Sequence, residues 1–149
     1  MTNQFSNFKF PKNIKAVALD VGEKRIGIAY SEDGIFAFPL KTVPAGNIAA
    51  EILQIAEGGS LERIIIGLPR NMDGSLGFQT DKIRLFVSDN LAKYLDLVEY
   101  IDETATSVEA ADLMRIEGKD PRKNPELIDA YSAKIILEDW ISKVKGKNK

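Results

Sequence analysis

The sequence predicts an α/β domain that begins with antiparallel strands and continues with parallel βα units. Near the N-terminus, short apolar segments follow one another with only brief polar connections, which favours antiparallel pairing. Further along, apolar segments alternate with stretches of helical periodicity, and strands joined through a helix pair in parallel. The length of 149 residues suits one domain, which we place at 14–144, between a flexible arm at 1–13 and a Lys-rich tail at 145–149.

Three strands are expected in the first part of the chain. The segment 14–20 is short, apolar and followed by a glycine, which is typical of a buried strand. A second strand is predicted at 25–31, and a Glu-Asp-Gly turn separates it from a third at 35–40. We expect Pro39 and Pro44 to end this third strand, because proline cannot donate to a ladder.

Helices and strands alternate in the rest of the chain. In chain order, the expected elements are a helix at 48–57, a strand at 63–68, a helix at 80–94, a strand at 97–102, a helix ending at 116 and a final helix running to about 144. Thr106 or Ser107 is suited to cap the third helix, and Asn124 with Pro125 to open the last one. The order is therefore β-β-β-α-β-α-β-α-α.

The absence of two residue types narrows the possible chemistry. The sequence has no Cys and no His, which excludes thiolate nucleophiles, histidine bases and metal sites built on either residue. Carboxylates remain, and they bind hard cations such as Mg²⁺ or Mn²⁺. The net charge of −2 argues against broad electrostatic binding of nucleic acid, although a local basic surface is compatible with it. Since no segment has the pattern of a membrane span or a signal peptide, we expect a cytoplasmic protein.

Four acidic residues lie where a metal site is expected. Asp20 ends the first predicted strand, and Asp102 and Glu103 end the last one. Asp129 lies near the start of the final helix. Three carboxylates that converge at the carboxyl ends of the strands could hold two divalent cations for phosphodiester hydrolysis. Adjacent strand residues point to opposite faces, so at most one of Asp102 and Glu103 joins Asp20. Acidic residues are also common in turns and at the starts of helices, so each of these acids has a purely structural explanation as well.

A polar loop and two basic groups are candidates for phosphate contacts. The loop at 67–75 follows a strand and precedes a helix, so its amides suit a phosphate, although it lacks the Walker ending and an ordinary connection also explains it. One basic group flanks the loop before the last helix, and the other is the Lys-rich C-terminal tail. Solubility is an equally simple explanation of the tail.

Four segments carry a resemblance to a known family. They are ALDVGEKRIGIA at 18–29, IGLPRNMDGS at 66–75, DETATS at 102–107 and IDAYSAKIIL at 128–137. Together they resemble the YqgF/RuvX family of RNase H-like proteins, which is described as Holliday junction resolvases and as nucleases that mature pre-16S ribosomal RNA. The resemblance extends from about Val17 to Trp140. Four segments in order with compatible spacing form a specific signal, whereas one alone would be weak.

The resemblance implies an RNase H-like fold, in which a mixed five-stranded sheet carries helices on both faces. It implies catalytic acids at Asp20, Glu103 and Asp129, which would hold one or two Mg²⁺ or Mn²⁺ ions, with Asp102 as the alternative ligand beside Glu103. The residues expected to contact the nucleic-acid backbone are Lys24, Arg25, Arg70, Asn71, Ser75, Arg115, Lys119, Arg122 and Lys123.

One departure from the family pattern bears on activity. The family usually has Arg and then an aliphatic residue after the acidic pair, where this chain has Thr104 and Ala105. The missing Arg removes a phosphate contact or an ion pair that would orient the acids, and this loss is expected to weaken substrate binding. The three acidic positions remain intact, so the resemblance still favours an enzyme.

The expected function is metal-dependent cleavage of structured RNA, namely maturation of the 5′ end of pre-16S rRNA, with association with the ribosomal subunit. The first alternative is resolution of branched DNA junctions, which requires a symmetric dimer; the expectation therefore covers a monomer or a homodimer. A second alternative is a non-catalytic module that binds RNA or protein. A phosphate-handling ATPase domain is a weaker alternative, because such enzymes close two domains over the nucleotide and this chain has room for one.

Overall fold

Backbone hydrogen bonding organises the chain into a sheet and surrounding helices in a computed structural model that describes residues 11–69, 78–102 and 106–147. The strands are β1 (Ala16–Val21), β2 (Arg25–Ser31), β3 (Phe38–Pro44), β4 (Arg63–Leu68) and β5 (Val98–Asp102). The α-helices are α1 (Ile48–Ala56), α2 (Phe78–Asn90), α3 (Ser107–Ile116) and α4 (Ile128–Lys147). Short 3-10 helices are η1 (Ala45–Asn47), η2 (Ala92–Leu97) and η3 (Pro125–Leu127). The bounds of β2 and β4 are those that the sequence predicts.

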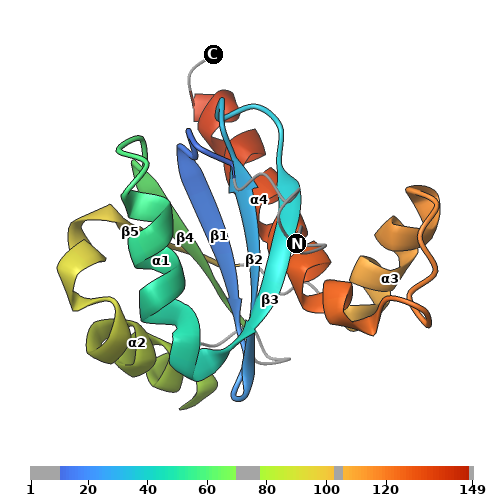
Figure 1. Ribbon diagram of the computed structural model, residues 1–149, viewed down its shortest axis with the longest axis horizontal. Coiled ribbons are helices and arrows are strands. Elements are labelled where there is room, and N and C mark those ends of the chain that lie inside the picture. Colours follow the sequence, from blue (N-terminus) through green and yellow to red (C-terminus); the bar gives the residue numbers. More distant parts are fainter. Residues whose placement is uncertain (1–10, 70–77, 103–105, 148–149) are drawn as a thin grey trace, which may run out of the picture.

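The five strands form one mixed sheet in the order β3-β2-β1-β4-β5. The pairs β1–β2 and β2–β3 are antiparallel, and the pairs β1–β4 and β4–β5 are parallel (Figure 1). Short connections and helical crossovers thus pair the strands as the sequence pattern predicts. The register pairs Leu19 with Ile66 and Leu68 with Asp102, so the carboxyl ends of β1, β4 and β5 meet at one edge.

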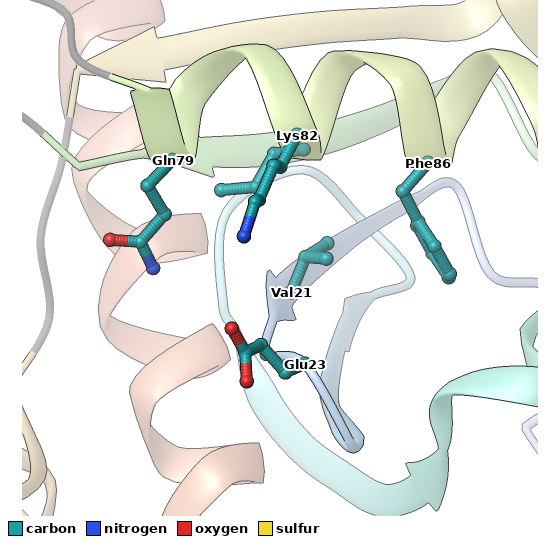
Figure 2. A pocket seen from close by; sticks show the side chains of 7 residues that line it. Val21, Glu23, Gln79, Lys82 and Phe86 are labelled. Atoms are coloured by element: carbon teal, nitrogen blue, oxygen red, sulfur yellow. The ribbon is translucent and has the colours of Figure 1, made fainter.

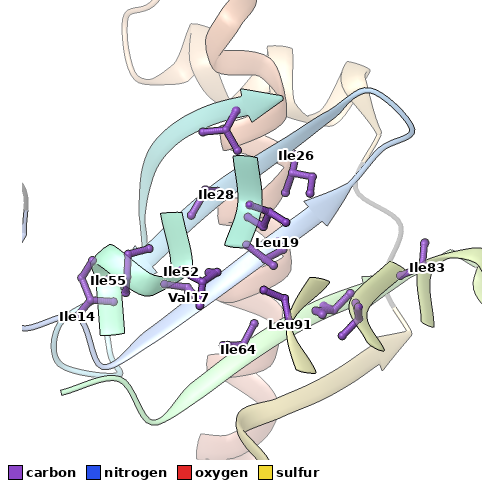
Figure 3. Packing of buried hydrophobic residues seen from close by; sticks show 14 of the residues in the cluster. Ile14, Val17, Leu19, Ile26, Ile28, Ile52, Ile55, Ile64, Ile83 and Leu91 are labelled. Atoms are coloured by element: carbon purple, nitrogen blue, oxygen red, sulfur yellow. The ribbon is translucent and has the colours of Figure 1, made fainter. Parts of the chain in front are cut away.

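The two faces of the sheet are covered by different helices. On one face, Val17 and Leu19 of β1 pack with Ile52 of α1 and Val87 of α2 in a branched aliphatic core (Figure 3). On the other face, the next residues along β1 pack against α4. Because successive strand residues point to opposite faces, both helical layers are encoded in the alternation of one strand. The expectation of helices on both faces is confirmed (Figure 1).

Small side chains bring α4 close to the sheet. Ala16 and Ala18 of β1 and Ala29 of β2 are buried against Ala133 of α4, and Ile136 completes the contact. Large residues at these positions would hold the helix further away, because interiors are close-packed. The short distance between helix and sheet positions the start of α4 near the end of β1.

The third strand begins later than the sequence predicts. The expected strand at 35–40 is wrong at its start, because the backbone amides of Ile35 and Phe36 donate to the Asp33 carboxylate at 2.8 and 3.0 Å. Pro39 does not end the strand, which continues past the predicted end at residue 40 to Pro44. Pro39 lies in the edge strand at a register irregularity, where the missing amide breaks no regular ladder bond.

Two predicted helix ends also differ. The helix expected at 80–94 ends at Asn90 and is followed by η2, so the last turns take the tighter 3-10 form. The final helix continues through Lys147, so residues 145–147 of the expected tail are helical. Among the described residues, no helix is long and apolar enough to cross a membrane.

Helix α3 packs on α4 rather than on the sheet. The Thr106 hydroxyl accepts from the Glu109 amide at 3.1 Å, and the Glu109 carboxylate accepts from the Thr106 amide at 3.2 Å, which forms a capping box. Ala110 and Met114 bury against Tyr131 of α4. This small interface makes α3 project from the body of the domain (Figure 1).

Candidate active site

The centre of the site is a row of three residues across neighbouring strands. Asp20 of β1 lies opposite Gly27 of β2, and Gly27 lies opposite Thr42 of β3. Asp20 shares its side of the sheet with Ala16 and Ala18, which is the side that α4 covers. A partly buried carboxylate therefore points toward the start of α4.

Gly27 admits the first turn of α4 into this row. A Cβ on Gly27 would overlap the backbone carbonyl of Asp129 and would lie 2.8 Å from the amide nitrogen of Ala130. Only a residue without a side chain permits this approach of helix and strand backbones. The contact brings Asp129 beside the residue paired with Gly27, which is Asp20.

The ionisation of Asp20 reflects this arrangement. Burial and the negative charge of Asp129 together raise the pKa of Asp20 from 3.8 to about 6. Burial is the larger cause, because it disfavours the charged form, and a neighbouring like charge adds to that effect. Perturbed carboxylates of this kind gather at functional sites more often than elsewhere.

Asp129 is also paired with a cation. The Arg25 Nε lies 3.2 Å from the Asp129 Oδ2, and the side chains are 71% and 30% exposed respectively. Arg25 precedes Gly27 by two residues and therefore lies on the same side of β2. Solvent screens such an exposed pair, so its contribution to stability is below about 1 kcal/mol. A hollow of about 530 Å³ opens beside the pair, with Thr42 and Glu126 in its lining.

Asp102, at the end of β5, faces away from Asp20. Ile101 is buried among the residues that face α4, so the next residue, Asp102, is directed to the opposite face and is exposed. Asp102 thus lies at the same edge as Asp20 but on the other side of the sheet. Glu103 lies outside the described residues. Among the residues that are described, no group of three acids forms a metal site.

The predicted phosphate-binding residues fall in three places. Lys24 and Arg25 are exposed beside the turn between β1 and β2. Arg115, Lys119, Arg122 and Lys123 are exposed on α3 and the segment after it, on the part that projects from the domain. Arg70, Asn71 and Ser75 lie outside the described residues. The flanking residues are joined directly. The Thr80 hydroxyl of α2 donates to the carbonyl of Pro69, which follows β4, at 3.1 Å.

Two features of the site escaped sequence reasoning. The first is Gly27, whose role depends on a contact with a helix that is distant in the chain. The second is a groove of about 500 Å³ between α2 and the turn after β1 (Figure 2). The spacing of the α2 residues in its lining, Gln79, Lys82, Ile83 and Phe86, marks one helical face and was a signal that could have found it.

Comparison with protein families gives a match over nearly the whole domain. The family model described as "RuvX: Holliday junction resolvase" matches residues 14–143. A protein of Trichormus variabilis is 39% identical over 135 residues, which cover 87% of this chain and 89% of that protein. A protein of Maridesulfovibrio salexigens is 36% identical over 135 residues, which cover 87% of this chain and 99% of that protein. Both are named "Putative pre-16S rRNA nuclease".

Comparison with solved structures gives the fold. The structure of Thermus thermophilus RuvC has a TM-score of 0.52 at 16% identity and covers 88% of this chain and 96% of that chain. The same protein in complex with a Holliday junction substrate has a TM-score of 0.54 at 14% identity, with coverages of 89% and 96%. At this identity the likeness shows the fold alone. It confirms the expected RNase H-like architecture.

Proposed function

The chain belongs to the RuvX family, and from this membership we propose that it is a nuclease that hydrolyses phosphodiester bonds of structured nucleic acid. The observation that carries the proposal is the approach of Asp129 to Asp20, which Gly27 permits. Burial raises the pKa of Asp20, and the negative charge of Asp129 adds to this effect. Two carboxylates held together at the carboxyl edge of an α/β sheet suit phosphate chemistry in a chain without His or Cys.

The donor set fits a divalent metal ion. Burial and the like charge of Asp129 disfavour ionisation of Asp20, and a bound cation would favour the ionised form. Oxygen ligands select Mg²⁺ or Mn²⁺, and we propose one or two such ions. Glu103 is our third ligand, because it follows Ile101 by two positions, the spacing at which residues of an extended chain share a face. Asp102 is the less suitable alternative, since it is directed away from Asp20.

Each group has a proposed task. A bound divalent cation supplies an activated water and charge neutralisation at the leaving oxygen. Asp20, Glu103 and Asp129 would hold that cation, and the backbone contact at Gly27 keeps Asp129 in place. Lys24 and Arg25 lie where a phosphate would approach the acids, and the basic residues of the projecting α3 segment contact the nucleic-acid backbone further away. We assign Arg70, Asn71 and Ser75 to the same task.

The proposed substrate is pre-16S rRNA, cleaved during maturation of its 5′ end in association with the ribosomal subunit. The names of the relatives from Trichormus variabilis and Maridesulfovibrio salexigens favour RNA. The description of the family model favours branched DNA, which is the second candidate. A monomer suits the first substrate, and a symmetric dimer suits the second. The proposed rRNA substrate favours a cytoplasmic location. We propose that residues 14–144 form the single nuclease domain.

A cleavage assay tests the proposal. Labelled pre-16S rRNA ends and four-way DNA junctions are offered side by side with Mg²⁺ or Mn²⁺. Wild type should cut the RNA, and Asp129→Asn should cut at least ~100-fold more slowly because a ligand is lost. Asp139→Asn, on the same helix and ion-paired with Lys143, is the matched control and should retain activity.

Other outcomes decide between the candidates. Cleavage of junctions alone moves the assignment to branched DNA. Binding of RNA by folded protein without any cleavage identifies a non-catalytic module, in which case Thr104→Arg is the variant that restores the residue usual in the family. Equal activity in Asp129→Asn and Asp139→Asn removes Asp129 from the site.

A further inference from the structure

A groove lies beside the end of β1, on the face of the sheet opposite to that of Asp20. We call it the α2 groove, and its lining residues are Val21, Gly22, Glu23, Gln79, Lys82, Ile83 and Phe86. Four of them lie on one face of α2, and the other three are the last residue of β1, Val21, and the two residues of the turn that follows it (Figure 2). Its volume of about 500 Å³ falls within the range of small-ligand sites.

The chemistry of the α2 groove has two parts. Val21, Ile83 and Phe86 form an apolar floor, in which Ile83 is only 4% exposed. Glu23, Gln79 and Lys82 surround it with exposed polar groups (Figure 2). An apolar floor with a few converging polar groups is typical of small-molecule sites.

These properties select a class of ligand. The Glu23 carboxylate offsets the positive charge of Lys82, so the groove offers a bare phosphate no net positive charge, and the apolar floor gives a phosphate no partner. A flat heteroaromatic ring matches both parts, because its faces pack on Phe86 and the floor while its edge carries donors and acceptors. Gln79 offers both a donor and an acceptor, Lys82 offers donors, and Glu23 accepts.

The position of the α2 groove connects it to the acids. Val21 directly follows Asp20, so the two Cα atoms are about 3.8 Å apart and the side chains point to opposite faces of one strand end. When the phosphate of a nucleic-acid chain lies at Asp20, the adjacent nucleotide therefore has to pass only the edge of the sheet to reach the α2 groove. A base within a continuous duplex is held in its stack, whereas an unpaired base is free to turn outward.

We propose that the α2 groove binds an unpaired nucleobase adjacent to the cleaved phosphate. The enzyme would thereby select strands with an unpaired nucleotide at the cleavage site over continuous duplex. The class of ligand rests on the proposed nuclease function, because that function supplies the phosphate at Asp20. In this arrangement Phe86 stacks with the base, while Gln79, Lys82 and Glu23 hydrogen-bond to its edge.

The first test is independent of cleavage. Protein with labelled Ile and Val methyl groups is titrated with 5′-mononucleotides and, separately, with ribose 5-phosphate. We expect the methyl signals of Ile83 and Val21 to shift with mononucleotides and to stay in place with the sugar phosphate. Removing the stacking partner in Phe86→Leu should weaken binding by ~5-fold or more. The matched control is Phe36→Leu, since Phe36 is 64% exposed and lies outside the groove.

Phe86 also packs against the core, so Phe86→Leu could weaken binding through a change in packing. A second variant separates the two effects. Gln79 is exposed, so Gln79→Ala leaves the core unchanged and should also weaken mononucleotide binding. Unchanged methyl signals at millimolar mononucleotide, or equal shifts with ribose 5-phosphate, would overturn the proposal. Normal affinity in both Phe86→Leu and Gln79→Ala would do the same.

The second test separates the α2 groove from the nuclease function. RNA with one abasic ribonucleotide beside the cleaved phosphate should be cut less efficiently by wild type, with a raised KM. Phe86→Leu should show no further loss on the abasic RNA, because both changes remove the same contact. Independent, multiplicative losses reject the groove proposal while leaving the nuclease intact. Base binding by a protein that cuts nothing supports the groove and rejects the nuclease.

Discussion

Gly27 and Asp129 meet backbone to backbone, 102 positions apart in the chain, so that a Cβ on Gly27 would overlap the Asp129 carbonyl. The same glycine is the ladder partner of Asp20. One residue without a side chain therefore determines how close the two carboxylates come. The small residues that follow along α4 and the sheet maintain this approach over the next turns.

Gly27→Ala should displace the start of α4. A methyl group at this position meets backbone atoms, which cannot rotate away, so we expect a loss of about 1–3 kcal/mol in the free energy of unfolding. Gly46→Ala is the matched control, because a Cβ there meets nothing within 4 Å. Urea denaturation measures both variants. Equal stability of the two would show that the contact at Gly27 is not tight.

Asp20→Asn should stabilise the metal-free protein at neutral pH. The folded-state pKa of Asp20 is raised to about 6, so its stabilising protonated form is fully present below about 3.8 and is lost as pH rises through about 6. The amide cannot ionise, so the variant avoids this loss and should gain about 1–2 kcal/mol at pH 8. At pH 4 the two proteins should differ little. Denaturation in chelator at both pH values checks this, and a gain that is independent of pH would contradict it.

Divalent cations should stabilise the folded protein through the same acids. At a concentration 100 times Kd, Mn²⁺ should raise the free energy of unfolding by about 2.7 kcal/mol, and a chelator should reverse the rise. The effect should weaken below pH 6, where protons compete for Asp20. Thermal melts with and without Mn²⁺ measure it, with Asp20→Asn as the variant that responds less. A full response in that variant would place the cation elsewhere.

Arg25→Gln should bind Mn²⁺ more tightly than wild type. Arg25 lies 3.2 Å from the Asp129 carboxylate, so its positive charge opposes a second cation there. Since the side chain is largely exposed, the gain should be modest, about two- to fivefold in Kd. Titration followed by the free Mn²⁺ signal gives the affinity directly. Weaker binding in the variant would mean that Arg25 orients Asp129 for the cation instead.

The projecting α3 segment should account for part of the salt dependence of RNA binding. Lys119→Gln and Arg122→Gln each remove one exposed cation, so each should lower the slope of log K against log salt by about 0.7–0.9. Lys93→Gln, on η2, is exposed away from this segment and serves as control. Binding at several salt concentrations gives the slopes. An unchanged slope in both α3-segment variants would remove this surface from the interface.

Sequence reasoning predicted those elements that depend on local pattern. The apolar runs at 25–31 and 63–68 became β2 and β4 without change, because periodicity and turn residues are properties of neighbours in the chain. The start of β3 was not predictable in this way. There the Asp33 side chain takes the backbone amides that a strand would have used.

For the candidate site too, some features follow from the sequence and others only from tertiary packing. The sequence by itself determined the available chemistry, which is carboxylate without His or Cys, and the positions of Asp20 and Asp129 at the ends of elements. Only the tertiary structure decided that the charge of Asp129 acts on Asp20, that Asp102 is directed to the other face, and that α2 and the end of β1 enclose a groove. The physical reason is that each relationship depends on packing between segments distant in the chain, where the absence of one Cβ at Gly27 has no local signature.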